Sequence, residues 1–230
     1  MLFDLRGRGR RRTVQAIYAC LAILMGGGLV LFGIGSDQSG GLVDAFTDDA
    51  QSGGSAAESV NKRIDAQLAK VRANPKNADA WAQLAILRFQ RAGIDGVAQD
   101  GSYTEAGKRR LTLATQAWER HLALDPKQPN LRAANLMVQA YQGIDQLSKA
   151  VRAKQLVTAA EDPPSSNLYQ QLAALAYQAG DNRVGDLAAT RAVDLAAPDQ
   201  REELRTALEA YKTQVAAQGN PGSATTTPGQ

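Results

Sequence analysis

Apolar residues recur at every third or fourth position through most of the chain beyond residue 55, the spacing that places them on one face of an α-helix. In the first such stretch, which predicts a helix over 57–73, the apolar positions are Val60, Ile64, Leu68 and Val71. Strand-like alternation is almost absent, and aromatic residues make up only 5% of the chain. The pattern therefore predicts an all-α domain over 56–217.

Turn and capping residues divide this domain into helices. Gly93 is expected to end the second helix. Ser102 and Glu105 have the spacing of a capping box, which predicts that a third helix begins there. Asp199 and Glu202 have the same spacing and predict the start of the last helix.

An uncharged, mostly apolar run over 13–35 precedes the domain. As a helix it would span roughly 35 Å, enough to cross the hydrocarbon core of a bilayer. Five arginines lie in the segment 1–12 and acidic residues follow the run, so the positive-inside rule predicts a cytoplasmic N-terminus and an extracytoplasmic domain. We expect a single-pass signal-anchor in the inner or plasma membrane. A cleaved signal peptide, with secretion of the domain, is the alternative.

Two polar segments flank the helical domain. Gly, Ser and Asp dominate 36–55, which predicts a flexible linker, and 218–230 has no large apolar residue and is expected to be disordered. The basic segment 1–12 accounts for the net charge of +3. Because the rest of the chain is close to neutral, the charge does not indicate binding of nucleic acid.

The helices contain an internal repeat. Segments that begin at Ala78, Leu131 and Ser166 align, and their first helices share a bulky, a leucine-like and a small position. These positions hold Trp81, Leu84 and Ala85, then Ala134, Met137 and Val138, then Tyr169, Leu172 and Ala173. The second helices begin with a small residue, which is Ala114, Ala150 or Gly185. The aromatic residue that follows is Trp118 in the first segment, whereas Lys154 and Ala189 break the pattern in the other two.

These residues resemble the tetratricopeptide repeat, a helix–turn–helix unit of about 34 residues. The resemblance implies three units over roughly 78–198 that stack as a short α-solenoid, with the helices before and after them covering the two ends of the stack. The first unit is longer than the family's, and the additional residues fall within 94–113.

In this family the first helices of the units line a groove that binds peptides or helices of other proteins. Carried over to this chain, the groove positions are Asp79, Ala82, Ile86 and Gln90 in the first unit, Arg132, Asn135, Gln139 and Gln142 in the second, and Asn167, Gln170, Ala174 and Tyr177 in the third. Only Arg132 is cationic, so the clamp that the family uses for C-terminal carboxylates is not expected. The amide-rich groove indicates an extended backbone or a polar helix as the ligand.

The chemistry-bearing residues do not form a catalytic pattern. His121, the single histidine, aligns with Ala192 in the third unit, so we expect it to be a partly buried packing residue. Cys20, the single cysteine, falls in the predicted membrane segment, and no nucleotide-binding, hydrolase or metal motif is present. We therefore expect no enzyme and no cofactor. The rival hypothesis is an enzyme that uses His121 with Asp95 and Asp100.

Together these features predict a membrane-tethered extracytoplasmic scaffold that binds other proteins or peptides, similar to bacterial proteins of translocation or envelope assembly. The bilayer is the second expected partner, through 13–35. An alternative from another class is a membrane organiser whose repeats pair with copies of themselves.

Overall fold

The computed structural model describes residues 55–219. The basic segment 1–12, the predicted membrane helix 13–35 and nearly all of the linker lie outside the described residues, as does the end of the chain from residue 220. The described part consists of eight α-helices without a β-strand, which confirms the prediction of an all-α fold. Within that part, no helix combines the length and the apolar character needed to cross a membrane.

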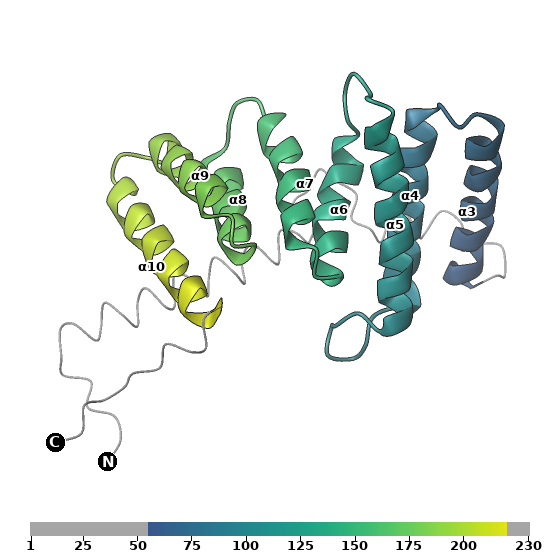
Figure 1. Cartoon of the computed structure of the whole chain (residues 1–230), viewed down its shortest axis with the longest axis horizontal. Coiled ribbons are helices and arrows are strands. Elements are labelled where there is room, and N and C mark those ends of the chain that lie inside the picture. The colour runs from purple at the N-terminus through teal and green to yellow at the C-terminus, as the bar shows by residue number, and fades with distance from the viewer. Residues whose placement is uncertain (1–54, 220–230) are drawn as a thin grey trace, which may run out of the picture.

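The helices follow one another as a row from α3 at one end to α10 at the other (Figure 1). In chain order they are α3 (Ala56–Ala73), α4 (Ala78–Asp95), α5 (Glu105–Ala123), α6 (Leu131–Gly143), α7 (Leu147–Ala159), α8 (Ser166–Gln178), α9 (Asn182–Leu195) and α10 (Arg201–Gly219). The closest packing is within the pairs α4–α5, α6–α7 and α8–α9. Helix α3 packs on α4, and α10 packs on both α8 and α9, so the arrangement is an α-solenoid.

Three local predictions of helix boundaries are wrong. Helix α4 continues through Gly93 to Asp95, and α10 begins at Arg201, so the residue directly before it is Gln200 and not Asp199. Helix α5 is capped by Thr104, whose hydroxyl accepts from the backbone N–H of Gly107 at 3.1 Å. Ser102 is not the cap because its hydroxyl donates to the carboxylate of Asp100, at 2.7 Å, inside the preceding loop.

Small side chains dominate the core and let the helices approach closely. Most of the core residues that are completely buried are alanines, and the largest side chains among them are those of Trp118, Leu84, Leu111, Met137 and His121. The closest approach joins the end of α4 to the start of α5. There, a Cβ on Gly107 would lie 2.1 Å from the carbonyl oxygen of Gly96, so only glycine fits.

The additional residues of 94–113 form the end of α4, the start of α5 and the loop between them. An isolated β-bridge between Val97 and Tyr103 closes this loop. The ring of Tyr103 packs against α6, where a Cβ on Gly143 would lie 2.8 Å from it. The expansion is therefore anchored on the second helix pair.

Candidate functional site

Helix α6 presents a row of polar side chains that have no partner within the described part of the chain. Arg132, Asn135, Gln139 and Gln142 are three or four residues apart, so they lie on one side of the helix. Arg132 and Gln142 are exposed, and Asn135 and Gln139 are half-buried. Within residues 55–219, no hydrogen bond or ion pair engages any of the four side chains, which leaves their donors and acceptors available to a ligand.

Helix α8 carries the corresponding positions of the next unit: Asn167, which is exposed, and Gln170 and Ala174, which are half-buried. The amide of Gln170 donates to the hydroxyl of Ser166 at 3.1 Å. In the described residues α4 packs directly on α6, but no comparable packing joins α6 to α8. We call the seven positions on these two helices the α6–α8 face: Arg132, Asn135, Gln139, Gln142, Asn167, Gln170 and Ala174.

The expected groove does not extend over α4. Of the four positions expected to line the groove on α4, Ala82, Ile86 and Gln90 are 0%, 3% and 6% exposed, respectively. The fourth, Asp79 at the start of the helix, is exposed. The reason is that α4 packs against three helices, α3, α5 and α6. The assignment of the α4 positions to a binding groove is therefore wrong beyond Asp79.

Tyr177 is also a packing residue and not a groove residue, since it is only 4% exposed. Its ring lies on Gly185, where a Cβ would come within 2.4 Å of the ring, and its hydroxyl donates to Asp186 at 2.9 Å. Lys212 of α10 lies over the ring, 5.6 Å from its centroid, and pairs with Asp186 at 2.7 Å. Burial, and next the hydrogen bond to Asp186, raise the pKa of Tyr177. Helix α10 thus covers this part of α8.

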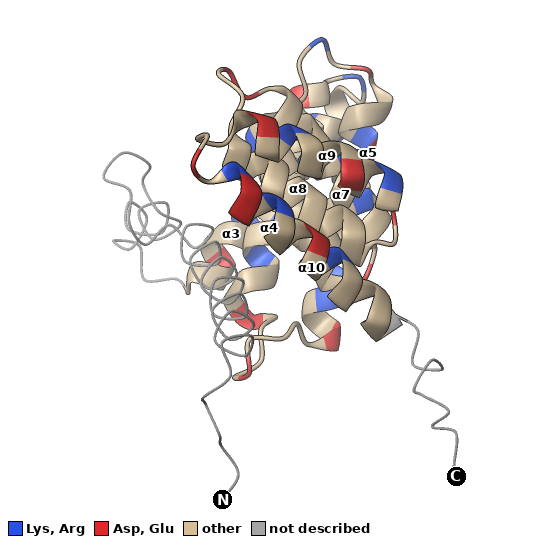
Figure 2. Ribbon diagram, turned by 90° about the vertical axis from the view of Figure 1, so that its left-hand side faces the viewer, with Lys and Arg blue, Asp and Glu red and all other residues tan. Residues whose placement is uncertain are grey.

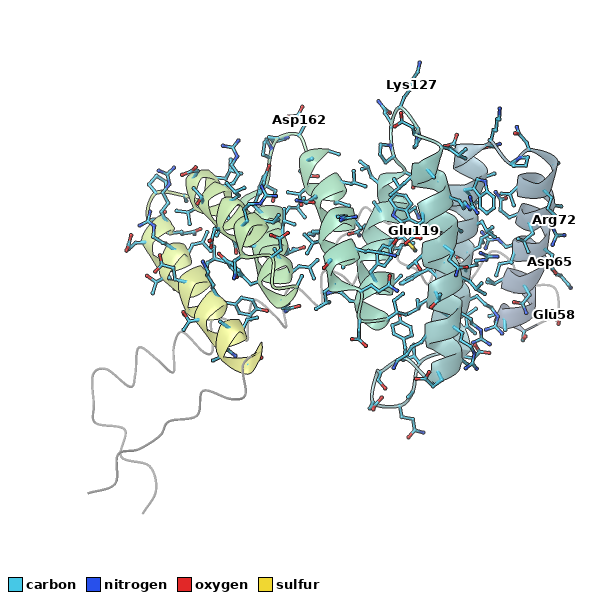
Figure 3. All side chains as sticks on the ribbon, in the orientation of Figure 1. Glu58, Asp65, Arg72, Glu119, Lys127 and Asp162 are labelled. Atoms are coloured by element: carbon cyan, nitrogen blue, oxygen red, sulfur yellow. The ribbon has the colours of Figure 1, made fainter. Side chains whose placement is uncertain are left out.

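A related cluster joins α5, α6 and α7. Glu119, in the middle of the row of helices (Figure 3), accepts from the hydroxyl of Tyr141 at 3.2 Å and from the ammonium of Lys149 at 2.7 Å. Burial, with the nearby charge of Glu119, raises the pKa of Tyr141. The cluster fixes the second helix pair against the first.

His121 lies completely buried and bridges three helices. Its Nε2 accepts from the backbone N–H of Asn130, just before α6, at 3.2 Å. The Nδ1 therefore carries the proton and donates to the carbonyl oxygen of Ala78, at the start of α4, at 2.8 Å. The imidazole also stacks on Trp118, with 5.0 Å between the ring centroids. This confirms the interpretation of His121 as a packing residue, and the burial is complete.

The acidic residues of the rival enzyme hypothesis also have structural partners. Asp95 pairs with Arg91, at 2.5 Å, and with Arg110. Asp100 accepts from the backbone N–H and the hydroxyl of Ser102. No group of three or more potential metal ligands occurs within residues 55–219.

Sequence analysis did not assign a role to Lys154, which is 4% exposed on α7. Its ammonium donates to the amide oxygen of Gln171 on α8 at 2.6 Å. Burial lowers the pKa of Lys154 from 10.5 to about 8. The sequence did indicate that Lys154 is buried, since it occupies the position that the buried Trp118 fills in the first helix pair.

Other surface features are less distinctive. On the side of the molecule that faces the viewer in Figure 2, basic and acidic residues are interspersed over the helices. An apolar hollow of about 590 Å³ lies between the ends of α5 and α7, where Leu122, Leu131 and Leu156 line it. Comparisons with protein-family models, curated proteins and solved structures found no match to this chain.

Replacing His121 by alanine is expected to lower the free energy of unfolding by roughly 3 kcal/mol, because it leaves a cavity and an unpaired backbone N–H at Asn130. Chemical denaturation of the purified full chain, followed by circular dichroism, measures this loss. The neighbouring exposed Arg120 is the matched control, and Arg120→Ala should change the value by less than about 0.5 kcal/mol. Equal effects of the two changes would contradict the bridging role.

The free energy of unfolding should rise by about 2 kcal/mol between pH 8 and about pH 9.5. Folding lowers the pKa of Lys154, so in this interval the unfolded chain holds a proton that the folded chain has released. Lys154→Met should be more stable than the wild type at pH 7 and should lose the rise. Lys149→Met, on the same helix, should keep it. A rise of the same size in the Lys154→Met chain would show that another group is responsible.

Proposed function

We propose that this protein is a membrane-tethered α-solenoid of the tetratricopeptide-repeat type whose α6–α8 face binds an extended polar segment of another protein. One observation carries the proposal: the side chains of Arg132, Asn135, Gln139 and Gln142 form a row on one side of α6 that has no partners among the described residues. Amides both donate and accept hydrogen bonds, so such a row suits the alternating N–H and C=O groups of an extended backbone.

The assignment to this repeat type is supported by the helix pairs and by the small residues at the aligned positions. Ala85 and Ala173, in the first helices of two units, are 0% exposed, and so are Ala114 and Ala150 in the second helices. A small residue at these positions lets the two helices of a pair approach closely. Trp118, at the aromatic position, is 1% exposed.

The membrane tether is proposed from the apolar run over 13–35 and the arginines before it. In this arrangement the helical domain is held near the outer surface of the membrane, where it meets proteins that emerge from or reside in the bilayer. We therefore propose a role in translocation or envelope assembly and not in catalysis.

If the domain is extracytoplasmic, a protease added to intact cells, stripped of any wall or outer membrane, should digest residues 36–230. A cytoplasmic protein in the same cells, digested only after lysis, serves as the control. Immunoblotting with a tag after residue 230 measures the loss. Complete protection of the tag in intact cells, with digestion after lysis, would refute the topology.

Photo-reactive residues placed at Gln139 and Gln142 should crosslink one and the same partner protein in living cells. The matched controls are Gln116 on α5 and Gln155 on α7, which are exposed glutamines outside the α6–α8 face. These positions should give little or no crosslinking to that partner, as measured by mass spectrometry of the adducts. Crosslinks at Gln116 or Gln155 without crosslinks on α6 would move the binding surface to the second helices of the pairs.

A further inference from the structure

Lys154 differs from the other lysines in the described part of the chain. Four of those lysines pair with a carboxylate, namely Lys62, Lys108, Lys149 and Lys212. Three more are exposed to solvent, namely Lys70, Lys76 and Lys127. Lys154 is the one lysine of residues 55–219 that is buried, and the acceptor of its ammonium is a neutral amide. A buried ammonium without a carboxylate is costly, which raises the question of what its counter-ion is.

The immediate surroundings of Lys154 contain a further unsatisfied group. Thr158 lies one turn along the same face of α7, is 2% exposed, and its hydroxyl has no hydrogen-bond partner. The ammonium has three donors, of which Gln171 engages one. Two donors of the ammonium and the hydroxyl of Thr158, which can donate, are therefore left for an acceptor to engage, and a carboxylate can accept from such groups.

A polar path leads from this interior to the α6–α8 face. Gln171, which accepts from Lys154, donates through its own amide to the side-chain oxygen of Asn167. Gln171 is half-buried and Asn167 is exposed at the start of α8, where it belongs to the face. None of the seven positions of the face is acidic, so the face itself supplies no carboxylate to Lys154.

We propose that an aspartate or glutamate side chain of the bound segment replaces Gln171 as the acceptor of Lys154, with the hydroxyl of Thr158 as a second donor. This inference rests on the proposed binding by the α6–α8 face and adds the class of partner, an acidic segment. The cation that would select the acidic segment is the ammonium of Lys154 on α7, the helix that packs against both α6 and α8. A charge-assisted hydrogen bond in such a buried place changes affinity by roughly 10- to 100-fold.

The test uses the full chain in lipid nanodiscs and an array of random twelve-residue peptides with amidated C-termini, so that only side chains supply carboxylates. Peptides that bind the wild type but not a Gln142→Trp chain are taken as ligands of the face. Each acidic residue in them is then changed to the corresponding amide, and affinities are measured for the wild type, Lys154→Met and Lys149→Met. Lys154→Met replaces the side chain as far as Cε by an apolar one and removes the buried charge, so it is expected to fold.

The ligands of the face should share an acidic residue whose change to an amide weakens binding to the wild type and to Lys149→Met by roughly 10-fold or more. The same change should have no effect in Lys154→Met, because the two changes remove one interaction. If acidic residues do not matter, or matter equally in Lys154→Met, the inference is wrong while binding by the face stands. If no peptide depends on Gln142, both the proposed function and the inference are wrong.

Discussion

The closure of the first and third helix pairs at their open ends is the interaction on which the arrangement depends. In the first pair, the imidazole of His121 donates to the carbonyl oxygen of Ala78, and in the third the hydroxyl of Ser166 donates to the carbonyl oxygen of Ala192. Ala78 aligns with Ser166, and His121 aligns with Ala192, so the same two positions are joined with the donor on opposite helices. His121 alone of these residues also reaches the next pair, through the N–H of Asn130. Since these backbone groups are at least partly removed from water, their hydrogen bonds constrain how the helices can be placed.

Packing at the two ends of the row decides which surface remains open. Helix α3 packs on α4 through Gln67, whose amide donates to the carbonyl oxygen of Ala80 at 2.8 Å. Helix α10 packs on α8 and α9, with Lys212 over Tyr177. The first helix of the middle pair, α6, is left with its polar row uncovered, and so is the N-terminal half of α8. The candidate site is therefore the part of the solenoid that its own terminal helices do not cover.

The sequence predicts the helices well because each helix must bury one face. Burial of one face places apolar residues at every third or fourth position, and this spacing is visible in the sequence. The polar row on α6 is instead named from the resemblance to the repeat family, whose groove positions were carried over to this chain. The sequence does not predict that Ile86 and Tyr177 are buried, because their positions on the helix are those of groove residues. What buries them is a neighbouring helix, and the placement of that helix depends on contacts between residues far apart in the chain. Small errors at helix ends have a local cause, as where Ser102 engages Asp100 and leaves the cap to Thr104.

Lys154 is a position where the repeat pattern is broken, and the break indicates a residue with a role other than packing. Its position holds Trp118 in the first pair, where an indole fills the interior, and a buried ammonium there is unfavourable for folding. An apolar residue would fill the same space without that cost, so packing alone gives no reason for a lysine. The polar path through Gln171 to Asn167 gives one, because it connects the charge to the face where a ligand is proposed to lie. The buried charge destabilises the free protein, and a bound carboxylate neutralises it. In the proposed complex, an acidic ligand therefore gains binding free energy that a neutral ligand does not. Lys154 then lowers the stability of the free protein and raises its selectivity for an acidic ligand.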